Sequence, residues 1–250
     1  MLLPFLKPKR LKPVLKISTP TLAVDVHAHV LPGLDDGPDT LEEALRVVDG
    51  LASQGVQKII ATPHIMGNYY RNTSELIENQ ANVLRQAIRQ RAIPITLECA
   101  AEYYLDEQMM ECLHRKDTLL TFGKANYLLF ETPFIQEPSE LQEAIQLMVQ
   151  QGYRPVLAHP ERCLYLQRNF DLTREIHKRG VLFQVNINSF MGYYSRQTQL
   201  FAEVLTDFQL IDFLATDIHR LNQLELLDMA RKQPYFLKNL DNGLLNDTLM

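Results

Sequence analysis

Residues 22–29 read L-A-V-D-V-H-A-H, an aliphatic run that passes into two histidines spaced two residues apart. Side chains two apart in an extended strand point to the same side, so His27 and His29 are expected to direct their rings at one point. The same alternation places Asp25 on that side, where it would orient a histidine ring. The acidic loop G-L-D-D-G follows at 33–37. This stretch therefore predicts a buried strand whose carboxyl end carries polar side chains.

Seven short aliphatic or β-branched runs recur along the chain, and longer stretches of helical period separate them. Strands that alternate with helices form βαβ units and a parallel sheet. Seven such units favour closure into a barrel over an open sheet, and nothing after residue 20 resembles a linker. We therefore predict an α/β fold with a single barrel-like domain over residues 21–250. The predicted strands are 22–27, 57–61, 95–100, 127–130, 155–158, 181–185 and 211–215.

Capping residues mark several helix starts. Thr40 with Glu43 forms a capping box ahead of an apolar stripe, and Ser139 with Gln142 forms another. The first of these helices is expected to stop at Gly55. Further helices are predicted at 74–93, 106–115, 170–179, 197–208 and 221–232.

The composition narrows the function classes. The chain of 250 residues has a net charge of −5, which argues against binding of nucleic acid through bulk positive charge. Its three cysteines are scattered and form no C-x-x-C motif, and no apolar run approaches the roughly 18 residues of a membrane span. These features predict a reducing, cytoplasmic compartment.

The first 20 residues differ from the rest. They carry five basic residues and no acid, so the net charge of −5 divides into +5 here and −10 in the remainder. A short apolar lead precedes the charges, which is the reverse of the order in a secretory signal. We interpret residues 1–20 as a basic arm. It is either a solvated leader or a segment attracted to an anionic membrane surface or an acidic partner.

Five of the seven histidines fall at or just beyond the carboxyl end of a predicted strand, together with four carboxylates. One histidine there is usually structural, but the carboxyl ends of parallel strands meet at one face, so these side chains are expected to converge. Divalent cations would remove the repulsion between the acids. Ligands without thiolate suit Mn, Fe or Zn, and nine ligands require two or three ions. The candidates are His27, His29, Asp36, His64, Glu102, Glu131, His159, Asp217 and His219.

One arginine is a further candidate for the site, and two histidines are expected to lie away from it. Arg162, in A-H-P-E-R at 158–162, would bring a guanidinium close to the ions, and the combination suits the stabilisation of phosphoryl oxygens. His114 and His177 lie in predicted helices and are expected at the surface.

The motifs D-V-H-A-H, T-P-H, A-A-E-Y-Y, L-F-E, A-H-P-E-R and A-T-D-I-H, in this order, resemble the PHP (polymerase and histidinol phosphatase) family. The sub-pattern H-x-H-x(3)-G-x-D-D-G, followed by T-P-H and H-P-E-R, is similar to that of the bacterial capsule-type tyrosine-protein phosphatases, which depend on manganese. The resemblance covers about residues 22–232 and leaves the basic arm outside. It implies a distorted (β/α)7 barrel and a metal-dependent phosphatase.

The resemblance also implies roles for individual residues. It distributes the ligands among three ions: His27, His29, Glu102 and Asp217 for the first; Glu102, Glu131 and His159 for the second; Asp36, His64 and His219 for the third. It implies that Arg162 contacts the substrate phosphate, that a hydroxide bridging two ions attacks, and that His64 or a water protonates the leaving phenolate. The implied substrate is the phosphotyrosine of a kinase that controls exopolysaccharide synthesis at the inner face of the membrane.

Other hypotheses stay open. A PHP phosphatase of histidinol phosphate or another small phosphomonoester would use the same ligands, because metals recognise the phosphate and not the alcohol. A second alternative is a PHP module that only binds a partner, but such modules often lack ligands, whereas all nine are present here. A third is a structural metal site, which would be closed to substrate. Cysteine chemistry is disfavoured, because Cys163 and Arg168 form C-x(4)-R without phosphate-binding glycines, whereas cysteine phosphatases use C-x(5)-R.

Overall fold

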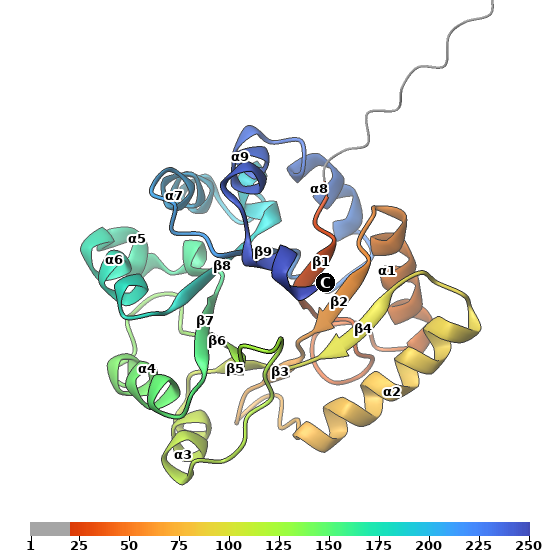
Figure 1. The fold of residues 1–250 in the computed structure, drawn as a ribbon, viewed down its shortest axis with the longest axis horizontal. Coiled ribbons are helices and arrows are strands. Elements are labelled where there is room, and N and C mark those ends of the chain that lie inside the picture. Colours follow the sequence, from red (N-terminus) through yellow and green to blue (C-terminus); the bar gives the residue numbers. More distant parts are fainter. Residues whose placement is uncertain (1–20) are drawn as a thin grey trace, which may run out of the picture.

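The computed structural model describes residues 21–250, whose core is a ring of parallel strands surrounded by helices (Figure 1). One sheet has the order β1 (Val24–Ala28), β2 (Lys58–Ala61), β4 (Thr96–Cys99). The other has the order β3 (His64–Ile65), β5 (Glu102–Tyr104), β6 (Tyr127–Glu131), β7 (Arg154–Ala158), β8 (Leu182–Asn186), β9 (Phe213–Ala215). All paired strands are parallel, which confirms the predicted α/β class. The predicted basic arm at 1–20 lies outside the described residues.

Two strands of the ring are interrupted, which is why nine strands correspond to the seven predicted ones. β2 resumes as β3 after two residues, and β4 resumes as β5 after two alanines. The backbone N–H of Glu102 donates to the carbonyl of Pro63 at 3.1 Å, so the two interrupted strands stay joined across the gap. The sequence pattern does not reveal β3 and β5, because both are short and begin with a charged or polar side chain.

The ring closes between β1 and the segment that follows β9. The N–H of Asp217 donates to the carbonyl of His27 at 2.9 Å, and the N–H of His29 donates to the carbonyl of Ile218 at 2.9 Å. Closure is therefore made by the backbone of candidate ligands, and it brings the first and last motifs of the chain together.

A register shift in β1 breaks the alternation of its side chains. Val24 and Val26 belong to the apolar cluster inside the ring, and Asp25 lies between them on the other side. Asp25 accepts a hydrogen bond from the backbone N–H of Thr216 at 3.0 Å and another from its hydroxyl. The prediction that Asp25 shares the side of His27 and orients a histidine ring is therefore wrong, because the bulge lets both Val26 and His27 face inward.

Helices cover the outside of the ring at all seven predicted places. Two further helices, α5 and α9, were not predicted; α5 has only five residues, and the proline that begins α9 is a start signal that the prediction did not use. The ranges are α1 (Leu41–Ser53), α2 (Ser74–Gln90), α3 (Glu107–Arg115), α4 (Leu141–Gln150), α5 (Leu164–Arg168), α6 (Phe170–Lys178), α7 (Arg196–Asp207), α8 (Gln223–Ala230) and α9 (Pro234–Asn242). Three short 3-10 helices are η1 (Pro160–Arg162), η2 (Ile187–Met191) and η3 (Leu245–Leu249).

The two predicted capping boxes have different outcomes. At α1, the Thr40 side chain accepts from the N–H of Glu43 while the Glu43 carboxylate accepts from the N–H of Thr40, as predicted. At α4 the box is absent, and the prediction is wrong. A turn in which the N–H of Leu141 donates to the carbonyl of Pro138 places the N-cap one residue after Ser139.

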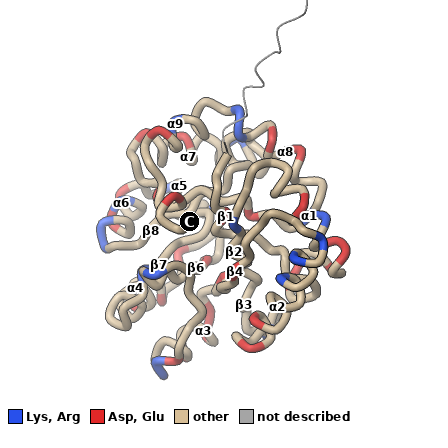
Figure 2. Tube along the Cα trace, turned by 45° about the vertical axis from the view of Figure 1, so that its right-hand side comes forward, with Lys and Arg blue, Asp and Glu red and all other residues tan. Residues whose placement is uncertain are grey.

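The outer helices carry both acidic and basic residues along their length (Figure 2). Among residues 21–250, no helix has both the length and the apolar character that crossing a membrane requires. His114 is exposed and contacts Glu143, and His177 is half-buried against Asp212, so neither lies with the other histidines.

One buried amide joins β1 to β9 below the site. Asn246, in η3, accepts from the N–H of Leu214 at 3.1 Å and donates to the carbonyls of Leu214 at 2.8 Å and Val24 at 3.0 Å. Substitution Asn246→Ala leaves these buried backbone groups unpaired. We expect the free energy of unfolding to fall by about 2–3 kcal/mol in urea titrations. The exposed Asn242→Ala should change it little, and equal effects of the two variants would contradict this assignment.

Candidate metal centre

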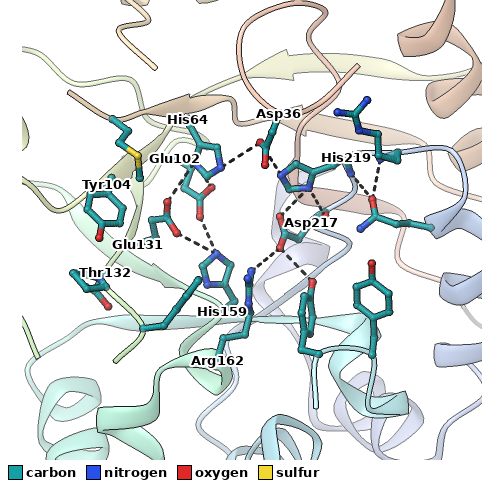
Figure 3. Close-up of a pocket in the computed structure, with 17 residues that line it drawn as sticks. Asp36, His64, Glu102, Tyr104, Glu131, Thr132, His159, Arg162, Asp217 and His219 are labelled. Atoms are coloured by element: carbon teal, nitrogen blue, oxygen red, sulfur yellow. Dashed lines mark hydrogen bonds and ion pairs between the residues drawn. The ribbon is translucent and has the colours of Figure 1, made fainter. Parts of the chain in front are cut away.

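A pocket of about 580 Å³ opens at the carboxyl ends of the strands. Figure 3 shows side chains from several strand ends and loops pointing into it. Seven of the nine candidate ligands line it, and Arg162 does as well. The other two, His27 and His29, lie fully buried beside Glu102 and Asp217. The strand ends thus bring all nine candidates together.

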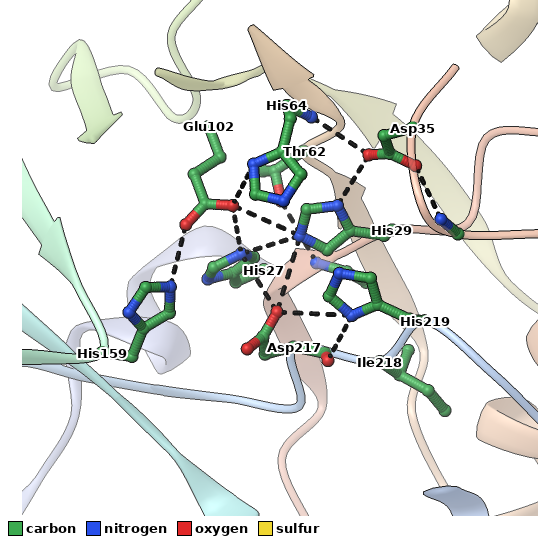
Figure 4. A network of polar contacts seen from close by, with 12 residues as sticks. His27, His29, Asp35, Thr62, His64, Glu102, His159, Asp217, Ile218 and His219 are labelled. Carbon is green, nitrogen blue, oxygen red and sulfur yellow. Dashed lines mark hydrogen bonds and ion pairs between the residues drawn. The ribbon is translucent and has the colours of Figure 1, made fainter. Parts of the chain in front are cut away.

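The first group of ligand atoms surrounds a single point (Figure 4). The Nε2 atoms of His27 and His29 lie 3.1 Å apart. Oε2 of Glu102 lies 3.2 Å from the former and 3.4 Å from the latter, and Oδ1 of Asp217 lies 3.5 Å from each. Two imidazole nitrogens and two carboxylate oxygens that face one another in this way suit a four-ligand metal ion.

Glu102 also belongs to a second group. Its Oε1 lies 3.0 Å from Nε2 of His159, and Oε2 of Glu131 lies 3.8 Å from the same nitrogen. His64 joins this group, because its Nδ1 lies 3.0 Å from Oε2 of Glu102 and 3.3 Å from Oε1 of Glu131. The structure therefore brings His64 close to the predicted second ligand set as well as to the third.

The third group is the outermost. Oδ1 of Asp36 lies 3.7 Å from Nε2 of His64 and 3.3 Å from Nε2 of His219. The ring of His29 stacks on that of His219 with 3.9 Å between the centroids, and His29 contributes a ligand atom to the same group. Asp36 is 52% exposed, so this group faces the mouth of the pocket.

The titratable side chains of the centre lie close together, and their pKa values are shifted in different directions. Burial alone would raise the pKa of Glu102, but the charges of His27 and His64 hold this pKa well below its ordinary value. Burial and the charge of Glu102 raise the pKa of Glu131 well above its ordinary value, and burial lowers the pKa of His159 to about 4. Dications would stabilise all these groups in their ligating forms at once, because they supply the positive charge that protons supply otherwise.

The donor set fits divalent cations. Three buried atoms of the centre have no hydrogen-bond partner within residues 21–250, namely Nδ1 of His64, Oε2 of Glu102 and Nδ1 of His159. Buried polar atoms are nearly always paired, and exceptions often mark an ion site. Imidazole and carboxylate donors in this number would hold two or three ions, with Glu102 shared between two of them.

Two side chains behind the centre orient the buried rings. Oε1 of Gln184 lies 2.7 Å from Nδ1 of His27. Figure 4 shows the second contact, in which Oδ2 of Asp35 lies 2.7 Å from Nδ1 of His29. Both contacts leave Nε2 of each ring free to bind a metal. The sequence analysis did not identify Gln184, although one polar residue in the buried strand V-L-F-Q-V at 181–185 is a signal for it.

Backbone strain is located at two of the candidate ligands. His159 has a φ of 36° and Asp217 a φ of 51°, both in the left-handed region that non-glycine residues seldom adopt. Each such residue costs about 1–3 kcal/mol and persists only where surrounding contacts impose it. The closing bond from the N–H of Asp217 to His27 is one such contact.

Arg162 is held between two aromatic rings. Its guanidinium carbon lies 4.4 Å from the centroid of Phe134 and 4.5 Å from that of Tyr194, and one of its nitrogens lies 3.5 Å from Oδ2 of Asp217. These cation–π contacts restrict the guanidinium to the wall of the pocket. With 27% of its side chain exposed, Arg162 remains accessible to an anion that enters.

Residues 23–242 match the model of the capsular polysaccharide synthesis CpsB/CapC family. The chain belongs to this family. It is 28% identical over 198 residues to the tyrosine-protein phosphatase YwqE of Bacillus subtilis, across 79% of this chain and 78% of the relative. Crystal structures of YwqE from Bacillus subtilis and CpsB from Streptococcus pneumoniae are described as those of metal-dependent tyrosine phosphatases. A chain from this work is 27% identical to the present chain and superposes with a TM-score of 0.78, and the match covers 90% of each chain.

The resemblance drawn from the motifs is thereby confirmed, and the fold is that of CpsB/CapC proteins. A histidinol phosphate phosphatase of Lactococcus lactis shares the fold at 14% identity and a TM-score of 0.56, with 89% of this chain and 94% of the other covered. At that identity the likeness extends to the fold alone.

The contact of Asp35 with His29 can be tested through metal affinity. Asp35→Asn keeps the shape of the side chain and removes its charge, so the ring of His29 becomes a weaker ligand. We expect affinity for Mn to fall about 10- to 100-fold, as measured by titrating stripped protein against a chelating dye. The matched control is Asp39→Asn, whose carboxylate is 77% exposed. If the two variants bound Mn equally well, Asp35 would have no orienting role.

Cys163 offers a test of the rejected cysteine mechanism. The side chain is buried, and burial raises the pKa of the thiol to about 12, so almost no thiolate exists near neutral pH. We expect Cys163→Ala to hydrolyse an aryl phosphate at a rate within about twofold of the natural protein. A loss as large as that caused by removing a ligand such as His159 would reopen the cysteine hypothesis.

Proposed function

We propose that this protein is a metal-dependent phosphomonoester hydrolase that acts as a protein-tyrosine phosphatase. The observation that carries the proposal is one pocket that Arg162 lines together with seven of the nine candidate ligands, with the other two buried directly beside them. Membership of the CpsB/CapC family and the likeness to YwqE, a tyrosine-protein phosphatase, support the same activity. A full ligand set beside an accessible arginine also disfavours a module that only binds a partner.

We further propose that two or three ions occupy the centre, with Mn as the native metal and Fe or Zn as substitutes. The first ion would be held by His27, His29, Glu102 and Asp217; the second by Glu102, Glu131 and His159; the third by Asp36, His64 and His219. When bound, such ions polarise phosphoryl oxygens and lower the pKa of water.

The side chains of the protein have separate tasks in this scheme. Arg162 would neutralise a phosphate oxygen that approaches the centre, and Phe134 and Tyr194 would hold its guanidinium in place. A phenolate leaving group has a pKa of about 10, so it needs less help from an acid than an alkoxide does. Proton donation falls to a water, or to His64 when no ion holds its ring, which is 13% exposed and lines the pocket.

The role of Arg162 leads to a graded prediction. We expect Arg162→Ala to lower turnover of p-nitrophenyl phosphate by about 10²-fold or more, because a charge-assisted contact in the transition state is lost. The turnover of Arg162→Lys should lie between that of the natural protein and that of Arg162→Ala, since lysine keeps the charge but not the planar guanidinium. Arg168→Ala, at a nearby exposed position, is the control. Near-natural turnover of Arg162→Ala would contradict the assignment.

The substrate class is tested by comparing three phosphomonoesters. Purified protein loaded with Mn is given p-nitrophenyl phosphate, a phosphotyrosine peptide and histidinol phosphate, and the release of phosphate is measured with and without a chelator. We expect metal-dependent hydrolysis of the two aryl phosphates and slow hydrolysis of histidinol phosphate. Absence of aryl phosphatase activity with Mn, Fe and Zn would refute the proposal. A preference for histidinol phosphate would show that the substrate is a small phosphomonoester and not phosphotyrosine.

We infer that the cellular substrate is a tyrosine kinase that controls exopolysaccharide or capsule synthesis, which the family description supports. We also propose that residues 21–250 form the catalytic domain, that the protein is cytoplasmic, and that the arm at 1–20 binds the anionic inner face of the membrane. The five basic residues of the arm support this last step. Binding to anionic and neutral vesicles, with and without residues 1–20, measures it.

A further inference from the structure

A second cavity, of about 290 Å³, lies next to the metal pocket. It is bounded by α1 on one side and by the loop between β9 and α8 on the other. His219 and Arg220 line both cavities, so the two cavities adjoin at these residues. The proposed phosphatase reaction does not use this second cavity.

The walls of the second cavity combine apolar surface with two guanidinium groups. Pro38, Val47 and Leu221 supply the apolar part, and Arg46 and Arg220 supply the charge. Arg46 is exposed on α1, and no carboxylate within residues 21–250 lies within 4.0 Å of it. The Arg220 side chain is 53% exposed, and its nearest acidic partner, Asp39, is 3.9 Å away. Both guanidiniums therefore keep donors available.

The acidic residue in the same wall is already engaged. One carboxylate oxygen of Glu43 accepts from the N–H of Asp39 at 3.1 Å and from the N–H of Thr40 at 3.3 Å, within the capping box of α1. A carboxylate at the N-terminus of a helix interacts favourably with the helix dipole. The Glu43 carboxylate is thus hydrogen-bonded within the cap of the helix, whereas the two guanidiniums of the same wall keep donors available.

The loop that carries Arg220 is held in place by an amide. Oε1 of Gln223 accepts from the N–H of His219 at 2.7 Å and from the N–H of Arg220 at 2.9 Å. This fixes the backbone of Arg220 relative to His219, a candidate ligand. The side chain of Arg220 therefore begins at a fixed backbone position beside the metal centre.

We propose that this cavity is a subsite for a carboxylate side chain of the substrate polypeptide, an Asp or Glu close in sequence to the phosphotyrosine. The inference rests on the proposed function, because the phosphotyrosine itself must occupy the metal pocket. The guanidiniums of Arg46 and Arg220 bind the carboxylate, and the apolar wall contacts its methylene groups. The subsite selects among phosphotyrosine sequences, which the metal centre alone does not do.

The test uses phosphotyrosine peptides that are neutral except for one Glu, placed in turn at each position flanking the phosphotyrosine. Their kcat/KM values are compared with that of the all-neutral peptide. We expect one or two positions of Glu to raise kcat/KM about threefold to tenfold, the effect of one or two exposed ion pairs. The preference should weaken at high salt, because exposed pairs are screened.

The assignment to particular residues is checked by Arg46→Gln, Arg220→Gln and the double variant. We expect the ratio of kcat/KM between the best Glu peptide and the neutral peptide to approach one in the double variant. Arg174→Gln, an exposed arginine on α6 without an ion-pair partner within residues 21–250, should leave the ratio as it was. A mutation that merely disturbed the fold would lower both kcat/KM values together and leave their ratio unchanged.

The outcomes separate the two proposals. If the natural protein hydrolyses neutral and Glu-containing peptides equally, the subsite is refuted and the phosphatase function stands. If the Glu preference survives in the double variant, the preference exists but lies elsewhere, and the assignment to this cavity is wrong. If no phosphotyrosine peptide is hydrolysed, the proposed phosphatase function itself is refuted.

Discussion

The burial of one carboxylate is the constraint on which the site depends. Glu102 is inaccessible to solvent, and its two oxygens lie within 3.4 Å of rings of four histidines, His27, His29, His64 and His159. Removing a carboxylate from water is costly unless positive charge and hydrogen-bond donors replace the water. A neutral imidazole supplies one N–H donor for this purpose, whereas a protonated ring or a bound cation also supplies positive charge. The arrangement therefore favours the binding of cations at this one place.

Irregular backbone gathers around this carboxylate. The bulge in β1, the gap between β2 and β3 and the gap between β4 and β5 all lie near the carboxyl ends of strands, as do the left-handed residues His159 and Asp217. Below them the ring is filled by apolar side chains such as Val26, Ile60 and Phe213. A close-packed interior resists deformation, so it can hold strained ligands at fixed positions.

The balance of charge acquires a different meaning once the site is assembled. The whole chain has a net charge of −5, which by itself suits no anionic ligand. Four acids of the centre would be outweighed by three dications, and Arg162, Arg220 and Arg46 surround the pocket and its neighbour. With such ions bound, a mildly acidic chain would present a cationic surface at the place where a phosphate would bind.

The sequence by itself determined seven of the nine strands, most helices, the family and the residues that meet at the strand ends, because periodicity and capping are local and parallel strands share one carboxyl face. It did not determine the side of the strand to which the Asp25 side chain points, since a bulge reverses that direction without changing the apolar pattern. Nor did it reveal Gln184, the ring contacts of Arg162 or the cavity beside Arg46, because those depend on distances between segments far apart in the chain. Only the folded ring, which brings the ends of distant strands together, decided them, and the bonds of His27 and His29 to the segment after β9 are one example.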